Sequence, residues 1–196
     1  MSEQTTDRLQ LWREQIASFT FPRWHELPEV ELYMDQIVGY LSQKLGVFYD
    51  TDDDRRSITA TMINNYVKQK IVAPPQKKRY SRAAVSALMV LFCAKQVLSI
   101  GLCGQLIAQC RDGMSGDGDE AAAAFHDRFC HVFEQVLHHT VAEDEDLTYL
   151  SVLRTEDCTL ATTAIAFANQ LYAERQILHS AQADDNSNEK ETTANE

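Results

Sequence analysis

Apolar residues recur at three- and four-residue steps along most of this 196-residue chain, a spacing that is typical of amphipathic helices. Alternating runs of Val, Ile and Thr are few, and the chain contains only seven Gly and four Pro. A fold with many strands needs more turn residues than this composition supplies. The pattern therefore predicts an all-α fold with one small hairpin.

Two helices are expected in the first 50 residues. The first covers residues 6–19. Pro28 opens the second, because proline is well placed at the first position of a helix, and Gly46 ends it. The acidic stretch Asp50 to Asp54 then forms a loop.

Three helices are expected in the middle of the chain, and each is preceded by a hydroxyl side chain that can cap its N-terminus. Thr59 caps a short helix within residues 57–71. Ser81 caps a long apolar helix over residues 82–98, which we expect to form the core of this region. Ser99 caps the third helix.

Two more amphipathic helices are expected near the C-terminus. One covers residues 119–140, and the other opens at Thr155 or Asp157 and ends near His179. Because two helices alone make a thin core, we expect them to close on the rest of the chain or on a second subunit. The last residues, 181–196, offer no large apolar side chain to bury, and a disordered acidic tail is expected there.

The basic residues of the chain are gathered in one segment. The net charge is −11, yet no Asp or Glu occurs from Arg55 to Arg111. Ten Lys and Arg lie in this segment: Arg55, Arg56, Lys68, Lys70, Lys77, Lys78, Arg79, Arg82, Lys95 and Arg111. A basic module inside an acidic protein is the electrostatic signature of a surface that binds a polyanion, with nucleic acid as the leading partner. The alternative is a basic face that docks on the acidic remainder of the same protein.

Several motifs of this segment occur in the order and spacing of a known DNA-binding module. Ile58-Thr-Ala-Thr-Met-Ile-Asn-Asn-Tyr66 is followed by Lys70-Ile-Val-Ala-Pro-Pro75, then by Arg79-Tyr80-Ser81 and Leu98-Ser-Ile100. With these motifs the chain resembles the winged helix-turn-helix of MerR-type regulators over residues 27–109. It is also similar to an uncharacterised bacterial family, a domain of unknown function with a MerR-like core. The resemblance implies a recognition helix that ends at Tyr66, a wing at residues 76–80 and a role in transcription regulation.

The chain also departs from the MerR pattern. Asn64 and Asn65 replace the usual Arg-Tyr of the recognition helix, and Lys70 replaces the usual glycine at its exit. A Gly-rich stretch, residues 111–118, interrupts the chain where such regulators have a long dimerisation helix. The resemblance therefore supports the fold better than it supports particular contacts to bases.

The expected contacts with duplex DNA fall into two groups. The exposed face of the recognition helix would read bases, because Asn can pair with an adenine edge and Thr can touch a thymine methyl group or a phosphate. The residues of this group are Thr59, Thr61, Asn64, Asn65 and Lys68. The wing and the start of the next helix have no required partner in the chain and would neutralise phosphates. The residues of this second group are Lys77, Lys78, Arg79 and Arg82. For both groups the alternative is plain solvation, and Tyr66 and Tyr80 are expected in the core.

The sequence predicts five regions. They are an N-terminal helix (1–26), a MerR-like winged helix-turn-helix DNA-binding module (27–111), a Gly-rich linker (112–118), a C-terminal helical region for assembly or sensing (119–180) and the acidic tail (181–196).

The Cys and His residues allow a second kind of hypothesis. Metal-ligand types gather near the C-terminus: His126, Cys130, His131, His138, His139 and the acidic run Glu143 to Asp146. A packed Cys130 thiol and a solvated acidic turn account for the same residues more economically, so no metal and no other cofactor is expected. The five Cys form no Cys-x-x-Cys pair, which is typical of buried thiols in a reducing compartment.

The remaining signals concern class and location. No catalytic motif is apparent, and no strand scaffold to carry one, so a non-enzyme is expected. The first seven residues lack the pattern of a signal peptide, and residues 83–94 are too few to cross a bilayer, which predicts a cytoplasmic protein without a membrane partner.

Together these observations predict a bacterial transcriptional regulator that binds double-stranded DNA as a homodimer. The sequence does not identify an effector ligand. The alternative is a non-enzymatic protein–protein interaction module whose basic face binds an acidic protein surface.

Overall fold

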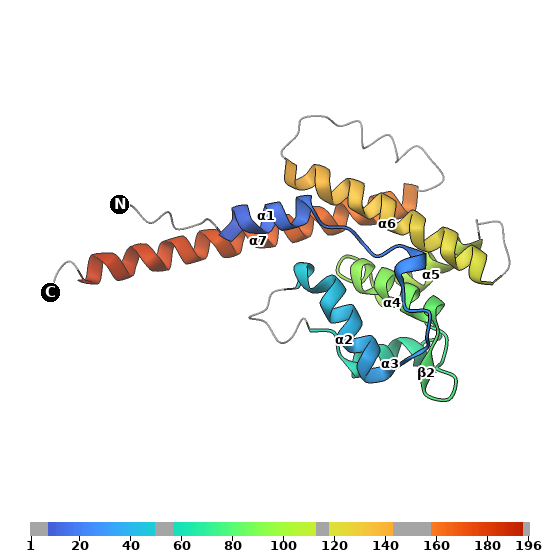
Figure 1. Cartoon of the computed structure of the whole chain (residues 1–196). Helices are drawn as coiled ribbons and strands as arrows, with labels where there is room; N and C mark the ends of the chain where they lie inside the picture. The colour runs from blue at the N-terminus through green and yellow to red at the C-terminus, as the bar shows by residue number, and fades with distance from the viewer. Residues whose placement is uncertain (1–7, 50–56, 113–117, 143–157, 194–196) are drawn as a thin grey trace.

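Figure 1 shows the computed structural model of the chain. It describes residues 8–49, 57–112, 118–142 and 158–193, and for residues 110–112 and 180–193 it describes the backbone alone. The predicted acidic loop at 50–54 and the Gly-rich residues 113–117 lie outside the described residues.

The described part of the chain is mostly helical, as the apolar spacing predicted. Its α-helices are α1 (Arg8–Ala17), α2 (Met34–Leu45), α3 (Ala60–Lys68), α4 (Arg82–Ala94), α5 (Ile100–Asp112), α6 (Asp119–Ala142) and α7 (Cys158–Thr193). Two short 3-10 helices, η1 (Trp24–Glu26) and η2 (Gly46–Phe48), and two strands, β1 (Leu32–Tyr33) and β2 (Arg79–Tyr80), complete the set.

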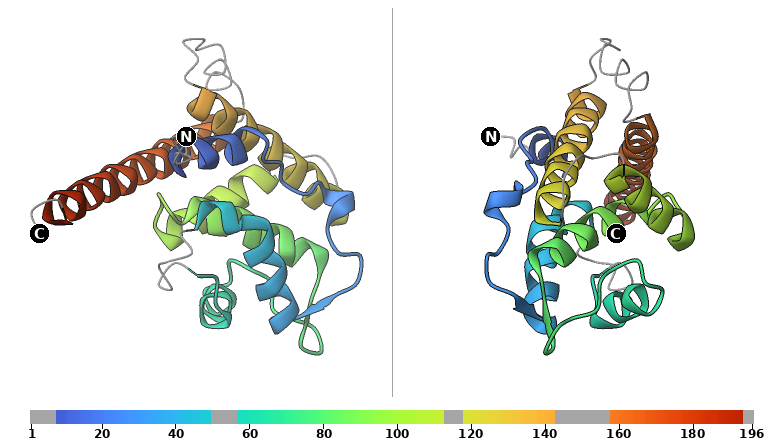
Figure 2. Two further views of the ribbon diagram at one scale, coloured as in Figure 1. Left: turned by 60° about the vertical axis from the view of Figure 1, so that its left-hand side comes forward. Right: turned by 90° about the vertical axis from the view of Figure 1, so that its right-hand side faces the viewer.

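The helices form two layers around α4. Helices α1, α6 and α7 lie together on one side and α2 and α3 on the other, whereas α5 contacts α4, α6 and α7 (Figures 1 and 2). Ten of the thirteen residues of α4 are buried, and α4 contacts α2, α5, α6 and α7. The apolar segment that the sequence placed at the core of the middle region therefore holds both layers together.

The three predicted N-caps are confirmed. The Thr59 hydroxyl accepts a hydrogen bond from the Met62 amide at the start of α3 (3.3 Å), and Ser81 accepts one from Ala84 at the start of α4 (3.3 Å). Ser99 accepts one from the Leu102 amide (3.4 Å) at the start of α5. Each bond satisfies a backbone N–H that the first helical turn leaves without a partner.

The predicted start of the second helix at Pro28 is wrong. Helix α2 begins at Met34, and the residues before it form strand β1, which pairs antiparallel with β2 in the register Leu32 to Tyr80 and Tyr33 to Arg79. The pairing partner lies more than 40 residues away in the chain, so no local signal could indicate it. Gly46, in contrast, follows the last residue of α2 as predicted.

Two helix ends also differ from the prediction. Helix α4 stops at Ala94 instead of Leu98, because the amides of Gln96 and Val97 bond to carbonyls three residues back and tighten the chain into a turn before α5. Helix α7 runs to Thr193, past the end expected near His179, so the backbone is helical through most of the tail that was expected to be disordered. No Pro or Gly occurs between these two points to stop the helix.

An extended segment, residues 19–23, joins the two layers and lies against α6; we call it the strap. Its backbone forms no sheet, so its buried polar groups need other partners. Helix α6 supplies them from side chains that are four or eight residues apart. His138 Nε2 donates to Phe19 O (2.8 Å), Phe21 N donates to Glu134 Oε1 (2.7 Å) and His126 Nε2 donates to Pro22 O (2.8 Å). Directly after the strap, Trp24 N donates to Asp127 Oδ1 (2.8 Å).

Glu134 is the charged member of this set. Its second oxygen accepts a hydrogen bond from Arg23 Nη2 (2.6 Å), so the buried carboxylate has both a cation and a backbone donor. A buried carboxylate without such partners would be strongly destabilising. Glu134 therefore fixes the strap on α6, and the Phe21 side chain beside it enters an aromatic cluster with Phe129 (5.0 Å between ring centroids).

His126 connects the strap to the second layer. Because Pro22 O can only accept, His126 Nε2 carries the hydrogen, and Nδ1 is free to accept from the Ser86 hydroxyl of α4 (2.9 Å). The His126 side chain is fully buried, and this burial lowers its pKa below the ordinary value. The neutral imidazole is thus the form that fits the native structure.

We predict that the free energy of unfolding falls as the pH drops through the titration of His126. Because the folded pKa is lowered, the unfolded chain takes up the proton more readily, so the stability is fully present above about pH 6.5 and is lost below it. The slope from this one group is at most about 1.4 kcal/mol per pH unit. Urea unfolding between pH 5 and 8 measures it. His126→Gln, which keeps a donor for Pro22 O but does not titrate, should be less stable and show a shallower slope, whereas an unchanged slope would contradict the assignment.

Candidate nucleic-acid interface

The predicted base-reading residues share one exposed helix face. Thr59, Thr61, Asn64, Asn65 and Lys68 are all exposed on or directly before α3. The opposite face carries Ile63 and Tyr66, which are buried, and the Tyr66 ring packs edge-on against Phe92 of α4 (5.6 Å). The core role predicted for Tyr66 and Tyr80 is confirmed, since both are at most 3% exposed.

The exit from α3 places a lysine in an unusual backbone conformation. The Ile71 amide bonds to Tyr66 O (3.1 Å) and the Lys70 amide to Val67 O (3.0 Å), which is the bond pattern of a Schellman motif. Lys70 occupies the left-handed position of this motif, with φ at 59°, where glycine is the usual residue. Lys70, which stands where MerR-type regulators have glycine, therefore adopts a backbone conformation that is unfavourable for lysine.

The predicted wing contains a tight turn with the same peculiarity. Gln76 and Arg79 exchange two backbone hydrogen bonds (2.9 Å each), so only Lys77 and Lys78 lie in the turn. Both have positive φ, 48° and 68°, as a type I′ turn requires. Asn and Gly are the residues that normally occupy such a turn.

These three lysines are the only non-glycine residues with positive φ in the described parts of the chain. A side chain in the left-handed region costs about 1–2 kcal/mol, because the Cβ atom crowds the following carbonyl oxygen. All three lysines are exposed, so no packing of their side chains compensates for this cost. Residues with strained backbone cluster at functional sites.

The basic groups gather at one end of the molecule. Helix α3 and the turn before β2 both lie at the end that is remote from α1, α6 and α7 (Figures 1 and 2). Among the residues that the structure describes, Lys68, Lys70, Lys77 and Lys78 make no ion pair with an acidic side chain. These four lysines are therefore not docked on the acidic side chains that the structure describes.

The two arginines of the predicted phosphate-binding group do have partners, contrary to the expectation. Arg79 Nε lies 3.6 Å from a Glu31 carboxylate oxygen. Arg82 lies 3.7 Å from Glu29, donates from Nε to Pro28 O (3.4 Å) and stacks on the Trp24 ring at 5.6 Å. Both arginines thus bind the loop before β1. This loop lies far from them in the sequence, so the sequence pattern did not indicate the contact.

The metal-ligand types noted in the sequence do not converge. His126 and His138 point their Nε2 atoms at strap carbonyls, and Cys130 is a buried thiol 3.5 Å from His126 Nε2. No group of three His, Cys, Asp or Glu suited to a metal ion occurs among the described residues, and the acidic run 143–146 lies outside them. The spacing that suggested metal ligands belongs to the side chains that hold the strap.

The cysteines follow the expectation in part. Cys93, Cys103 and Cys130 are buried, and burial raises the pKa of the Cys130 thiol to about 12 and that of Cys93 further. Cys158, at the start of α7, is exposed, which differs from the prediction of buried thiols.

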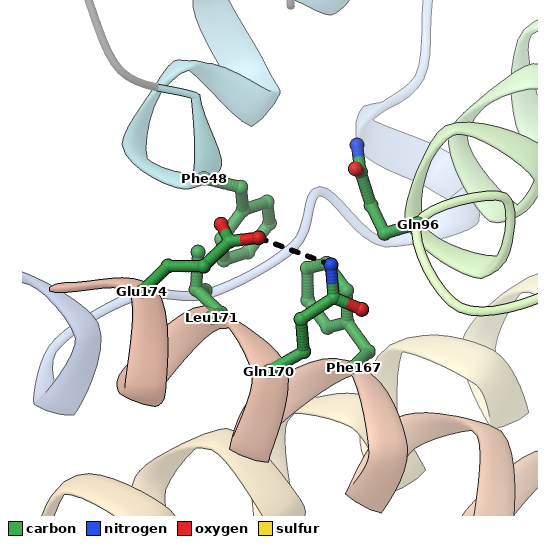
Figure 3. Close-up of a pocket in the computed structure, with 6 residues that line it drawn as sticks. All are labelled: Phe48, Gln96, Phe167, Gln170, Leu171 and Glu174. Carbon is green, nitrogen blue, oxygen red and sulfur yellow. Dashed lines mark hydrogen bonds between the residues drawn. The ribbon is translucent and has the colours of Figure 1, made fainter. Parts of the chain in front are cut away.

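One hollow of the structure lies between η2 and α7, beside Phe48, Phe167 and Glu174 (Figure 3). Its volume is about 10 Å³, which at most equals that of a single water molecule. Gln170 and Glu174 close one side through a hydrogen bond (3.1 Å). This hollow is too small for a substrate or cofactor.

Across the helices that the structure describes, none combines the length and the apolar composition needed to cross a membrane.

Comparison with known proteins identifies one matching protein family. Residues 22–129, more than half of the chain, match the family model described as "Domain of unknown function (DUF1836)". No curated protein and no solved structure matches the chain. The matched region begins in the strap and ends within α6, so it contains all of the exposed lysines discussed above.

We predict that Lys77→Asn combined with Lys78→Gly stabilises the protein. The Asn-Gly pair suits a type I′ turn, so the change removes two unfavourable backbone conformations, and the entropy of the new glycine offsets part of the gain. The net increase in the free energy of unfolding is about 1 kcal/mol, or about 2–4 °C in Tm. Calorimetry measures it.

The control for this prediction is Lys77→Gln combined with Lys78→Gln, which removes the same two charges but keeps long side chains at both positive-φ positions. This variant should show no comparable gain, because the backbone strain remains. An equal gain in both variants would assign the effect to charge instead of strain, and a loss of stability in the Asn-Gly variant would contradict the strain at this turn.

Proposed function

The chain belongs to the family of the domain of unknown function DUF1836, and we propose that it is a non-enzymatic DNA-binding transcriptional regulator with a MerR-like winged helix-turn-helix. In this proposal α2 and α3 form the helix-turn-helix, and the turn before β2 is the tip of the wing. The observation that carries the proposal is the set of exposed, strained lysines Lys70, Lys77 and Lys78. Replacement by Gly or Asn would relieve the strain, so their positive charge is what the chain retains at the cost of stability.

The charge of these lysines is available for a polyanion. Together with Lys68 they form four exposed cations without an ion pair in the described residues. Phosphate contacts of this kind fix the position of a protein on duplex DNA without reading its sequence. A lysine side chain is flexible and strongly hydrated, so it suits phosphates whose position varies along the duplex.

The two arginines of the wing have a different part in the proposal. Arg79 and Arg82 bind Glu31 and Glu29, and the planar guanidinium group suits such fixed carboxylate partners. They would therefore contribute less to the affinity for DNA and chiefly hold the wing against the loop before β1.

Sequence readout would come from the exposed face of α3. Asn64 and Asn65 are exposed amides on a short helix whose other face is anchored in the core, so their backbone is fixed while their side chains remain free to meet a base edge. Asn can bond an adenine in two places in the major groove. Thr61 is exposed on the same helix, and Thr59 is partly committed, since its hydroxyl caps α3.

A homodimer is part of the proposal, because two copies would present two recognition helices to a two-fold DNA site. The observation in its favour is exposed apolar surface on the outer layer. Leu11 of α1 is 45% exposed, and Ile177 and Leu178 of α7 are 68% and 44% exposed. Exposed apolar side chains on neighbouring helices commonly pack on another chain.

The second candidate is a protein-interaction module whose basic end binds an acidic protein surface. It is favoured by two apolar side chains near the wing, Val30 at 73% and Tyr33 at 52% exposure. Aromatic side chains are enriched in protein interfaces. DNA binding and its salt dependence separate the two candidates.

We predict that the protein binds random duplex DNA with a log–log salt slope of about −4 per protomer, from the four exposed lysines. The Lys77→Asn/Lys78→Gly variant, which is expected to be more stable, should bind all sequences more weakly and reduce the slope by about 2. Fluorescence anisotropy at several salt concentrations measures both values. Arg8→Gln, at the start of α1 and outside the proposed helix-turn-helix, is the control and should leave the slope unchanged. Absence of DNA binding even at low salt would overturn the proposal in favour of the protein-interaction module.

We also predict that Asn64→Ala and Asn65→Ala narrow the difference in affinity between preferred and random sites by about 1–3 kcal/mol. The preferred sites come from sequencing the genomic fragments that the purified protein retains. Gln69→Ala, an exposed amide at the C-terminal end of α3, is the control and should keep the preference. Equal weakening on every sequence for the Asn variants would refute their role in readout.

A further inference from the structure

A groove of about 500 Å³ lies between α5 and α7, on a different part of the molecule from the tip of the wing. Its lining residues come from the turn before α5, from α5 and from the first turns of α7. On the α5 side the lining is Val97, Leu98, Leu102, Gln105, Leu106 and Gln109, and on the α7 side it is Cys158, Thr159, Thr162, Thr163 and Ala166. All of these residues belong to the described part of the chain.

The lining contains no charged residue, although 24% of the chain is charged. A charged ligand would lose its hydration there without gaining a counter-charge, which is strongly unfavourable. The apolar side chains Leu98, Leu102 and Leu106 make the groove suited to an apolar body. Leu102 is 49% exposed, so a ligand in the groove would remove its surface from water.

Two hydroxyls on the α7 side of the groove favour a ligand that donates hydrogen bonds. Thr162 and Thr163 already donate their hydroxyl hydrogens to the carbonyls of Cys158 and Thr159 (2.7 and 2.8 Å), so each hydroxyl oxygen can offer only lone pairs. The amides of Gln105 and Gln109, on the facing helix, can accept through their oxygens and can also donate through their nitrogens. A neutral ligand with an N–H or O–H group would meet these acceptors.

We propose that this groove binds a neutral, mainly apolar small molecule with at least one hydrogen-bond donor. The volume lies within the range of about 300–1,000 Å³ that is usual for small-molecule sites, and the combination of apolar walls with a few polar groups is their usual composition. The proposal concerns a site distinct from the basic end and does not rest on DNA binding.

The first test uses N-phenyl-1-naphthylamine, a neutral aromatic amine with one N–H donor, as the probe. Its fluorescence should rise on binding to one saturable site per chain. Ala166→Trp places a large side chain in the groove from an exposed position and should weaken binding by at least about tenfold. Ala173→Trp, at an exposed position of α7 outside the groove, should bind the probe like the unmodified protein. Equal binding by both variants would overturn the proposal.

The second test uses Cys158, the exposed thiol of the groove, as an internal reporter. In a Cys110→Ser background, N-ethylmaleimide should modify Cys158 quickly, since Cys93, Cys103 and Cys130 are buried. When Ala173→Trp, which leaves the groove open, is combined with Cys110→Ser, the naphthylamine probe should slow the modification of Cys158. If Cys158 is unreactive without the probe, the chain itself fills the groove. If the probe does not change the rate of Cys158 modification, the probe binds elsewhere. Either result would overturn the proposal.

Discussion

The hydrogen bonds between α6 side chains and the backbone of the strap are the constraint on which the rest of the structure depends. The strap is buried at Phe21 and Pro22 but forms no helix or sheet, so its peptide groups would be left without partners if α6 were apolar on this face. One side of α6 supplies the missing hydrogen-bond partners through three side chains that are four or eight residues apart: His126, Glu134 and His138. The outer layer is thereby joined to the strap at several points.

The same contacts determine where the basic end of the molecule lies. His126 reaches Ser86 of α4 as well as Pro22, so the strap, α6 and the central helix share one network. The chain that leaves the strap continues through η1 to β1, which pairs with β2 next to the turn at Lys77-Lys78. The three lysines in unfavourable backbone conformations at that end are tolerated because the fold as a whole supplies enough stability.

Local features of the sequence could be predicted because they depend on neighbours in the chain. The three N-caps, the end of α2 at Gly46 and the buried face of α3 follow from hydrogen bonds and periodicity within one or two turns. The replacement of glycine by Lys70 was also visible, although its meaning was not, because only the backbone conformation shows the strain.

Features that depend on distant contacts were decided by the tertiary structure alone. The residues after Pro28 form a strand because β2 is there to pair with them, and Arg79 and Arg82 are held by acidic residues about 50 positions earlier. His126, Cys130 and His138 have the spacing of metal ligands, yet all three donate hydrogen bonds to strap carbonyls. Periodicity and capping residues thus indicate which segments are helical and where three of them begin. The partner of each buried polar side chain depends on packing, because burial leaves such a group with only the neighbours that the fold places beside it.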